Sequence, residues 1–259
     1  MSSPRKVILE CFSNGMMPEE CRVVEKELAT RVKDSFITTK VTQEALAMQR
    51  GELGLSPGDF VVGNAPFIKL CIERAGLSPL VASDYPRCLE SLLQRRIWQC
   101  TLQDAATLAM TTDAKFYIKP ASDIKAFSGE EATSGWLQEL LTRFPATLPV
   151  SCSEFVDIAC EYRVYVAQGR LLATCHYTHP GCERAPLDHT VVERTVATLQ
   201  ASDEAMSGYA IDFCVLKKPS GLVTALMEVN DGTTTGFYAG VSERDYTAMV
   251  EARWRQLLS

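Results

Sequence analysis

Two polar residues near the C-terminal end of the chain combine a carboxylate and an amide at a spacing that suits metal binding. Glu228 and Asn230 follow the apolar run 222–227 and lie two positions apart. Because alternate residues of a strand project from the same face, both side chains are expected to point to one side of a sheet. Carboxylate and amide oxygens are ligands typical of magnesium or manganese rather than zinc.

A second carboxylate is predicted to face this pair. Asp212 interrupts the apolar run 209–216, and residues 217–221 have the composition of a turn. A hairpin centred on Ser220 sets Asp212 directly opposite Glu228. Two facing carboxylates repel each other unless a cation lies between them, so Asp212, Glu228 and Asn230 predict a site for Mg²⁺, with Mn²⁺ as the alternative. The competing interpretation is an amphipathic hairpin whose polar side chains face water.

The composition is that of an ordinary globular protein and argues against several classes of function. The chain has 259 residues, of which 46% are hydrophobic, and a net charge of −6. Its Lys and Arg residues are scattered, so nothing favours a nucleic-acid partner. No apolar window is long enough to span a bilayer, and no signal-peptide core follows Met1, which favours a cytoplasmic protein that does not bind membranes. The oligomeric state is left open.

The histidines and some of the cysteines suggest a competing zinc site. No two cysteines have the Cys-x-x-Cys spacing, and most lie in apolar runs, as reduced core thiols do. The side chains that come near each other in the sequence are Cys175, His176, His179, Cys182 and His189. Cys175 and His176 are neighbours in a predicted strand and therefore point to opposite faces, which argues against a shared zinc ion.

The order of predicted elements indicates an α/β or α+β fold with an N-terminal lobe, residues 1–84, and a larger part, residues 85–259. In the lobe, strands at 7–12, 36–39 and 59–63 alternate with helices at 18–32 and 67–75, which favours a sheet covered on both faces. Residues 85–101, with leucines at helical spacing, form the predicted connection. Residues 179–207 are polar and are expected to form an irregular loop.

The larger part contains further polar residues on predicted strands. Lys119 ends a strand at 116–120 and is followed by a loop of small residues, a helix at 134–143 and an extended segment at 154–157. A hairpin then turns at residues 168–169. A regular register sets Glu161 opposite His176 and Arg163 opposite Thr174, and so places Glu161, Arg163 and His176 on one face.

Taken in order, these segments resemble the ATP-grasp superfamily over roughly residues 85–240, closest to small ATP-grasp proteins of bacteria and phages. The segments that carry the resemblance are Lys119-Pro120, 121–129, Glu154-Phe155-Val156, Glu161 to Val166, Asp212 and Glu228-Val229-Asn230. No single motif decides the matter, but the ordered set is specific. The resemblance implies an ATP-grasp fold, in which two α+β lobes that follow the N-terminal lobe clamp ATP.

The resemblance also implies roles for individual residues. Lys119 and Arg163 match the lysine and arginine that meet the phosphates, and both are candidate catalytic residues. The residues expected to bind the nucleotide are Arg96, Lys119, Lys125, Glu154, Phe155, Val156, Glu161 and His176. Asp212, Glu228 and Asn230 match the magnesium ligands.

Within this set the expected contacts differ. Glu154, Phe155 and Val156 resemble the hinge that reads adenine through backbone groups, and Glu161 resembles the acid that holds the ribose. At the α-phosphate the sequence offers two adjacent arginines, of which Arg96 is preferred and Arg95 is the alternative.

The implied activity is that of an ATP-dependent carboxylate–amine ligase. ATP and Mg²⁺ would convert a carboxylate to an acyl phosphate, an amine would attack it, and ADP and phosphate would leave. The amine partner is a small amino acid, a peptide or a protein terminus. Two alternatives are a nucleotide-binding partner protein without turnover and a kinase that phosphorylates without ligation. The chain lacks the Gly-x-x-x-x-Gly-Lys-Ser/Thr loop of P-loop enzymes.

Overall fold

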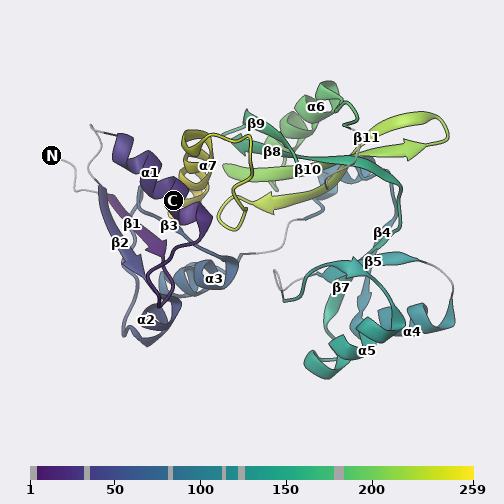
Figure 1. Ribbon diagram of the computed structural model, residues 1–259, viewed down its shortest axis with the longest axis horizontal. Helices are drawn as coiled ribbons and strands as arrows, with labels where there is room; N and C mark the ends of the chain where they lie inside the picture. Colours follow the sequence, from purple (N-terminus) through teal and green to yellow (C-terminus); the bar gives the residue numbers. More distant parts are fainter. Residues whose placement is uncertain (1–4, 32–35, 81–83, 113–114, 122–125, 178–183) are drawn as a thin grey trace.

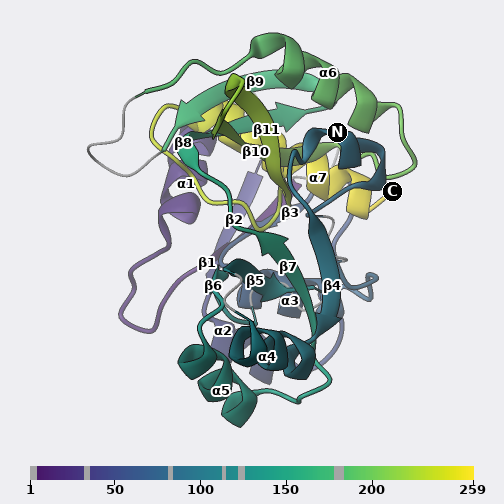
Figure 2. The same ribbon diagram turned by 90° about the vertical axis from the view of Figure 1, so that its right-hand side faces the viewer.

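The computed structural model describes residues 5–31, 36–80, 84–112, 115–121, 126–177 and 184–259. Within these residues the chain forms three sheets with helices packed on their faces (Figures 1 and 2). Helices and strands are mixed throughout, which confirms the predicted fold class.

The N-terminal lobe is built on a parallel sheet in the order β2 (Phe36–Val41), β1 (Arg5–Glu10), β3 (Phe60–Val62), with helices α1 (Glu19–Thr30), α2 (Gln43–Met48) and α3 (Ala65–Arg74). Residues 7–10 of β1 are buried in succession, as expected of a parallel strand that is covered on both faces. Helix α3 begins after Asn64, whose side chain accepts a hydrogen bond from the Phe67 amide. The predicted strands and the two predicted helices of this lobe are confirmed to within a few residues.

The middle sheet is antiparallel, in the order β4 (Ile97–Thr101), β7 (Pro149–Glu154), β5 (Phe116–Pro120), β6 (Glu130–Glu131), and packs on α4 (Leu102–Thr111) and α5 (Ser134–Arg143). The expectation of a helical connection up to residue 101 is wrong. Only Arg87–Leu92 is helical, as the 3₁₀ helix η1, and 97–101 is a strand. Thr101 ends this strand and forms a capping box with Asp104, so helix α4 starts there.

The third sheet has the order β11 (Gly221–Asp231), β10 (Gly208–Lys218), β8 (Ile158–Ala167), β9 (Arg170–His176), and all its neighbours are antiparallel. Helix α6 (His189–Gln200) packs on one face of it through Val192, Val196 and Leu199. The prediction of an irregular loop is therefore wrong for residues 189–200. Asp188 caps this helix by accepting hydrogen bonds from its first amides, and its apolar spacing buries one side.

The C-terminal helix α7 (Glu243–Leu257) lies between the N-terminal lobe and the third sheet (Figure 1). Its Tyr246, Met249 and Trp254 share one core with β1 and β3. A Cβ atom added to Gly208 of β10 would lie 2.0 Å from the Met249 carbonyl oxygen, so only glycine allows this approach. The domain boundary after residue 84 stays a prediction, since α7 continues the core of the N-terminal lobe. In the described part of the chain, no helix combines the length and the apolar character needed to cross a membrane.

Candidate active site

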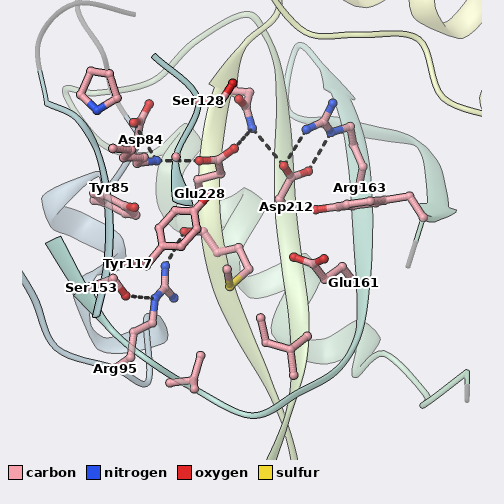
Figure 3. A pocket seen from close by; sticks show the side chains of 18 of the residues that line it. Asp84, Tyr85, Arg95, Tyr117, Ser128, Ser153, Glu161, Arg163, Asp212 and Glu228 are labelled. Atoms are coloured by element: carbon pink, nitrogen blue, oxygen red, sulfur yellow. Dashed lines mark hydrogen bonds and ion pairs between the residues drawn. The ribbon is translucent and has the colours of Figure 1, made fainter. Parts of the chain in front are cut away.

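A pocket of about 890 Å³ lies between the middle sheet and the third sheet (Figure 3). Its walls come from residues 84–85, from Arg95, from the ends of β5 and β7, and from β8, β10 and β11 with the loop that follows β11. The predicted site residues that line it are Lys119, Glu154, Phe155, Val156, Glu161, Arg163, Asp212, Glu228 and Asn230. The fold thus gathers in one cavity residues that lie more than a hundred positions apart.

The predicted pairing of Asp212 with Glu228 is confirmed, although the hairpin is not centred on Ser220. The strands leave the turn with Lys218 opposite Gly221, and the register then shifts between Asp212 and Phe213. This β-bulge makes Met227 the extra residue, so that both Met227 and Glu228 line the pocket. The Asn230 side-chain amide lies between the carboxylates, and its Nδ2 donates to Asp212 Oδ2 at 3.2 Å and to Glu228 Oε1 at 3.1 Å.

Arg163 of β8 forms a two-point ion pair with Asp212. Its Nε donates to Oδ1 at 2.7 Å and its Nη2 to Oδ2 at 2.6 Å, and both side chains are buried. The ring of Tyr238 lies 4.2 Å from the guanidinium carbon. Burial raises the pKa of the Asp212 carboxyl, Arg163 acts against that rise, and the charge of Glu228 adds to it. Asp212 is therefore a carboxylate that depends on nearby cations to stay charged.

Lys119 of β5 reaches across the pocket to Glu228. Its Nζ lies 2.6 Å from Glu228 Oε2 and 2.8 Å from Asp84 Oδ2, and 4.4 Å from the centre of the Tyr85 ring. Burial opposes the charged form of Lys119, but Glu228, Tyr85 and Asp84 outweigh burial and raise its pKa. Burial likewise favours a neutral Glu228, but Lys119 and Asn230 outweigh it and lower the pKa of that carboxyl. Both groups are thus held in their charged forms.

The two adjacent arginines behave differently, and the preferred one is not in the pocket. Arg95 lines it and donates to the carbonyl oxygens of Leu226 at 2.6 Å and Met227 at 2.7 Å. The guanidinium of Arg96 instead lies 4.7 Å from the centre of the Trp98 ring and is not part of the lining. The choice of Arg96 over Arg95 is therefore wrong. Successive residues entering β4 point to opposite sides, and only the tertiary structure decides which side faces the pocket.

The segment that joins β7 to β8 borders the pocket with apolar groups. Phe155 and Val156 line the cavity together with Ile158 and Met227, and Phe155 is 54% exposed. An exposed aromatic ring beside such a wall can hold a flat heteroaromatic group. Glu161 lines the same cavity and precedes Arg163 on β8 with one residue between them, so both project from the same face of that strand.

His176 does not share the pocket, and the register predicted for its hairpin is wrong. The turn at 168–169 is confirmed, but a bulge between Tyr165 and Val166 shifts the strands, so that Arg163 faces Cys175 and His176 faces Tyr162. The His176 ring packs edge-on against Tyr162 at 5.1 Å, on the face opposite Arg163. A bulge adds one residue and so reverses the face of every side chain beyond it.

Some predicted residues lie outside the part of the chain that the structure describes. These are Lys125, with the loop around it, and His179 and Cys182 of the zinc alternative. Cys175 and His176 face opposite sides of β9, as expected. Among the described residues, no group of three or more His, Cys, Asp or Glu side chains is placed to hold a metal ion, so a metal here would need the amide of Asn230.

The sequence analysis missed several residues of the pocket wall, namely Asp84, Tyr85, Tyr177, Thr234 and Tyr238. Tyr177 follows Cys175 by two positions, so the correct register of β9 would have placed it beside Arg163. The others lie in connecting segments without periodicity, where the sequence carries no signal for a cavity. The rings of Tyr177 and Tyr238 meet edge-on at 5.2 Å next to the guanidinium of Arg163.

Three solved structures are similar to this chain over nearly its whole length. The D-alanine–D-alanine ligase of Bacillus anthracis, solved with ATP, is 15% identical, covers 98% of this chain and 99% of its own, and superposes with a TM-score of 0.56. A RimK domain ATP-grasp protein of Sphaerobacter thermophilus is 15% identical over 95% and 98%, with a TM-score of 0.55. The macrocyclase MdnC of Microcystis aeruginosa, bound with the precursor peptide MdnA, is 12% identical over 94% and 98%, with a TM-score of 0.57. These likenesses concern the fold.

No curated protein sequence matches the chain. A family model described as an ATP-grasp domain, the second family of its clade, matches residues 92–249, which is more than half of the sequence. The match confirms the ATP-grasp fold and the class of enzyme expected from the resemblance, an ATP-dependent ligase of this superfamily. The chain therefore belongs to this family of ATP-grasp domains.

Proposed function

We propose that the chain is a carboxylate–amine ligase that uses Mg-ATP and an acyl-phosphate intermediate. In this reaction the carboxylate oxygen attacks the γ-phosphorus and ADP leaves, and the amine then attacks the acyl carbon and phosphate leaves. The observation that carries the proposal is the set Asp212, Glu228 and Asn230, which faces Lys119 and Arg163 in one pocket. Phosphoryl transfer requires anionic metal ligands and cations around the same phosphates.

The donor set fits a magnesium ion. It offers two carboxylates and one side-chain amide within hydrogen-bonding distance of both, and rotation of the Asn230 amide would turn its oxygen toward the carboxylates. Lys119 and Arg163 balance the two negative charges in the structure. When bound, the ion would neutralise charge on the phosphate oxygens.

The remaining groups divide the pocket between nucleotide and substrates. Phe155 and Val156 would border the adenine through the hinge, and Glu161 would accept hydrogen bonds from the ribose hydroxyls. Lys119 would direct its ammonium to the phosphates. Arg95, whose guanidinium lies near the same wall, would add positive charge there.

Arg163 is proposed to stabilise charge that develops during the transfer. Its two bonds to Asp212 use two of the five N–H donors of a guanidinium, and the Tyr238 ring packs against the guanidinium plane. The ion pair and the ring fix the orientation of the group before any substrate binds. A donor that is already oriented costs no reorganisation when negative charge appears on the migrating phosphoryl group.

The class of amine is proposed from the similar structures. One of them is named as a D-alanine–D-alanine ligase and another is bound with a precursor peptide, so amino acids and peptides are the acceptors to be screened. The pocket volume of about 890 Å³ lies at the upper end for small-molecule sites, which suits a nucleotide together with a second ligand.

Oxygen-isotope transfer tests the proposal directly. A screen of amino acids and peptides for ADP release first identifies a carboxylate and an amine. The carboxylate is then supplied with heavy oxygen, and we expect one labelled oxygen in the released phosphate and ADP formation that depends on the amine. A stable phosphorylated product without amine dependence would instead indicate a kinase. Binding of ATP without ADP release in any mixture would indicate a non-catalytic partner protein.

A further inference from the structure

The Lys119 ammonium is held by carboxylates from two different parts of the chain. Glu228 comes from β11, and Asp84 comes from the segment that leads out of the N-terminal lobe, at 2.6 Å and 2.8 Å from Nζ. The Lys119 side chain is only 12% exposed. A buried ammonium needs such counter-charges, but one carboxylate at hydrogen-bonding distance already supplies a full opposite charge.

The two carboxylates differ in what else they have to do. Glu228 accepts from Lys119 with Oε2 and from Asn230 with Oε1, so both of its oxygens are engaged. As a proposed ligand of Mg²⁺, Glu228 has to release one of these partners when the ion binds. Asp84 lies on neither β10 nor β11 and is not part of the metal set.

Asp84 is fixed in place independently of its side chain. Its carbonyl oxygen accepts a hydrogen bond from the Val229 amide at 2.9 Å, directly after Glu228 in β11. The next residue, Tyr85, places its ring 4.4 Å from the Lys119 Nζ and 5.9 Å from the Arg95 guanidinium. The seat of the lysine is therefore built by residues 84–85, as Figure 3 shows for the labelled side chains.

We infer that Asp84 is a positioning residue that acts through Lys119. It draws the ammonium away from Glu228, so that Glu228 is available to the metal ion, and it keeps the ammonium beside the phosphates while the ion binds. This inference rests on the proposed function, because it takes Glu228 as a metal ligand and Lys119 as a phosphate contact.

Two opposite effects follow if Asp84 loses its charge. Lys119 then pairs with Glu228 alone, so Mg²⁺ has to compete with the lysine for that carboxylate and binds more weakly. ATP without metal should bind more tightly, because its phosphates no longer compete with Asp84 for the lysine. A loss of local structure would instead weaken both.

The experiment compares Asp84→Asn with the wild type and with Asp203→Asn, a control at a carboxylate that is 84% exposed. Calorimetry with EDTA gives the Kd for metal-free ATP, and titration with Mg²⁺ at saturating ATP gives the half-saturating concentration for ADP release. We expect that concentration to rise on the order of tenfold in Asp84→Asn, as for other residues that support a metal ligand. Metal-free ATP should bind roughly two- to fivefold more tightly, the range of one partly screened charge contact. Asp203→Asn should change neither value.

Unchanged values in Asp84→Asn, or a loss of both affinities, would overturn the inference about Asp84. Wild type that fails to bind ATP with or without Mg²⁺ would overturn the proposed function itself, so the two failures are distinguishable. Asp84→Glu keeps the charge one methylene further along and should give an intermediate Mg²⁺ requirement. If Asp84→Asn does not fold, Asp84→Glu carries the test, and a wild-type Mg²⁺ requirement in that variant would refute the positioning role.

Discussion

Asp212 faces Glu228 because strand β11 accommodates Met227 as a bulge. Without the extra residue the regular ladder would set Asp212 opposite Met227, and Glu228 would point with Leu226 into the core under α6. The bulge therefore turns two consecutive residues toward the pocket, one apolar and one acidic. The metal site depends on this local irregularity as much as on the residue types.

Nucleotide binding should be visible as added stability. At about 100 times its Kd, Mg-ATP should increase the free energy of unfolding by about 2.7 kcal/mol through mass action, since it binds only the folded chain. Thermal unfolding with ADP, ATP and no nucleotide measures this. A melting temperature that does not move with saturating Mg-ATP would count against the pocket as a nucleotide site.

Glu228→Gln should abolish ADP release while the chain stays folded. The amide has nearly the same volume, and Lys119 keeps Asp84 as its counter-charge, but the metal set loses one of its two carboxylates. ADP release and circular dichroism are measured together, with Glu193→Gln on the exposed side of α6 as the control. Turnover that continues with Mg²⁺ would place the metal elsewhere.

The buried pair of Arg163 and Asp212 should show strong coupling in stability. Arg163→Met alone leaves a buried carboxylate without its partner and should cost about 3–5 kcal/mol of unfolding free energy, whereas the double variant Arg163→Met with Asp212→Leu should lose much less. Urea unfolding of the wild type, both single variants and the double variant closes the cycle. Additive losses would show that the pair is not coupled.

Arg163→Lys separates catalysis from folding at the same position. Lysine keeps the charge beside Asp212 but lacks the planar fork that meets two oxygens at once. We expect kcat to fall on the order of 10²- to 10³-fold with a smaller change in ATP affinity, because the interaction is stronger in the transition state. Should only ATP affinity fall, Arg163 would be a binding residue in the ground state.

The adjacent arginines provide a matched pair of variants. Arg95→Ala removes a pocket cation that also donates to two carbonyl oxygens of β11, and ATP should bind about 10- to 100-fold more weakly, as expected for the loss of hydrogen bonds from a charged group. Arg96→Ala removes a guanidinium that packs on Trp98 outside the pocket and should leave ATP affinity near that of the wild type. Calorimetry on both variants decides between them, and equal effects would refute the assignment.

Local sequence patterns determined much of the fold and the chemistry of the site. Apolar runs interrupted by one polar residue predicted β8, β10 and β11, and the order of lysine, acid, arginine and metal-type ligands pointed to the ATP-grasp superfamily. Such features depend on the alternation of faces within one strand, which is fixed by backbone geometry.

Only the tertiary structure decided the register beyond each bulge and the walls made by connecting segments. The bulge in the β8–β9 hairpin removed His176 from the pocket, while the bulge in β11 brought Glu228 into it. Neither bulge is marked by glycine or proline, because strand packing on both faces selects the register. Asp84 and Arg95 reach the site because their segments contact β11, a strand more than 120 residues away, and contacts over such distances leave no periodic trace in the sequence.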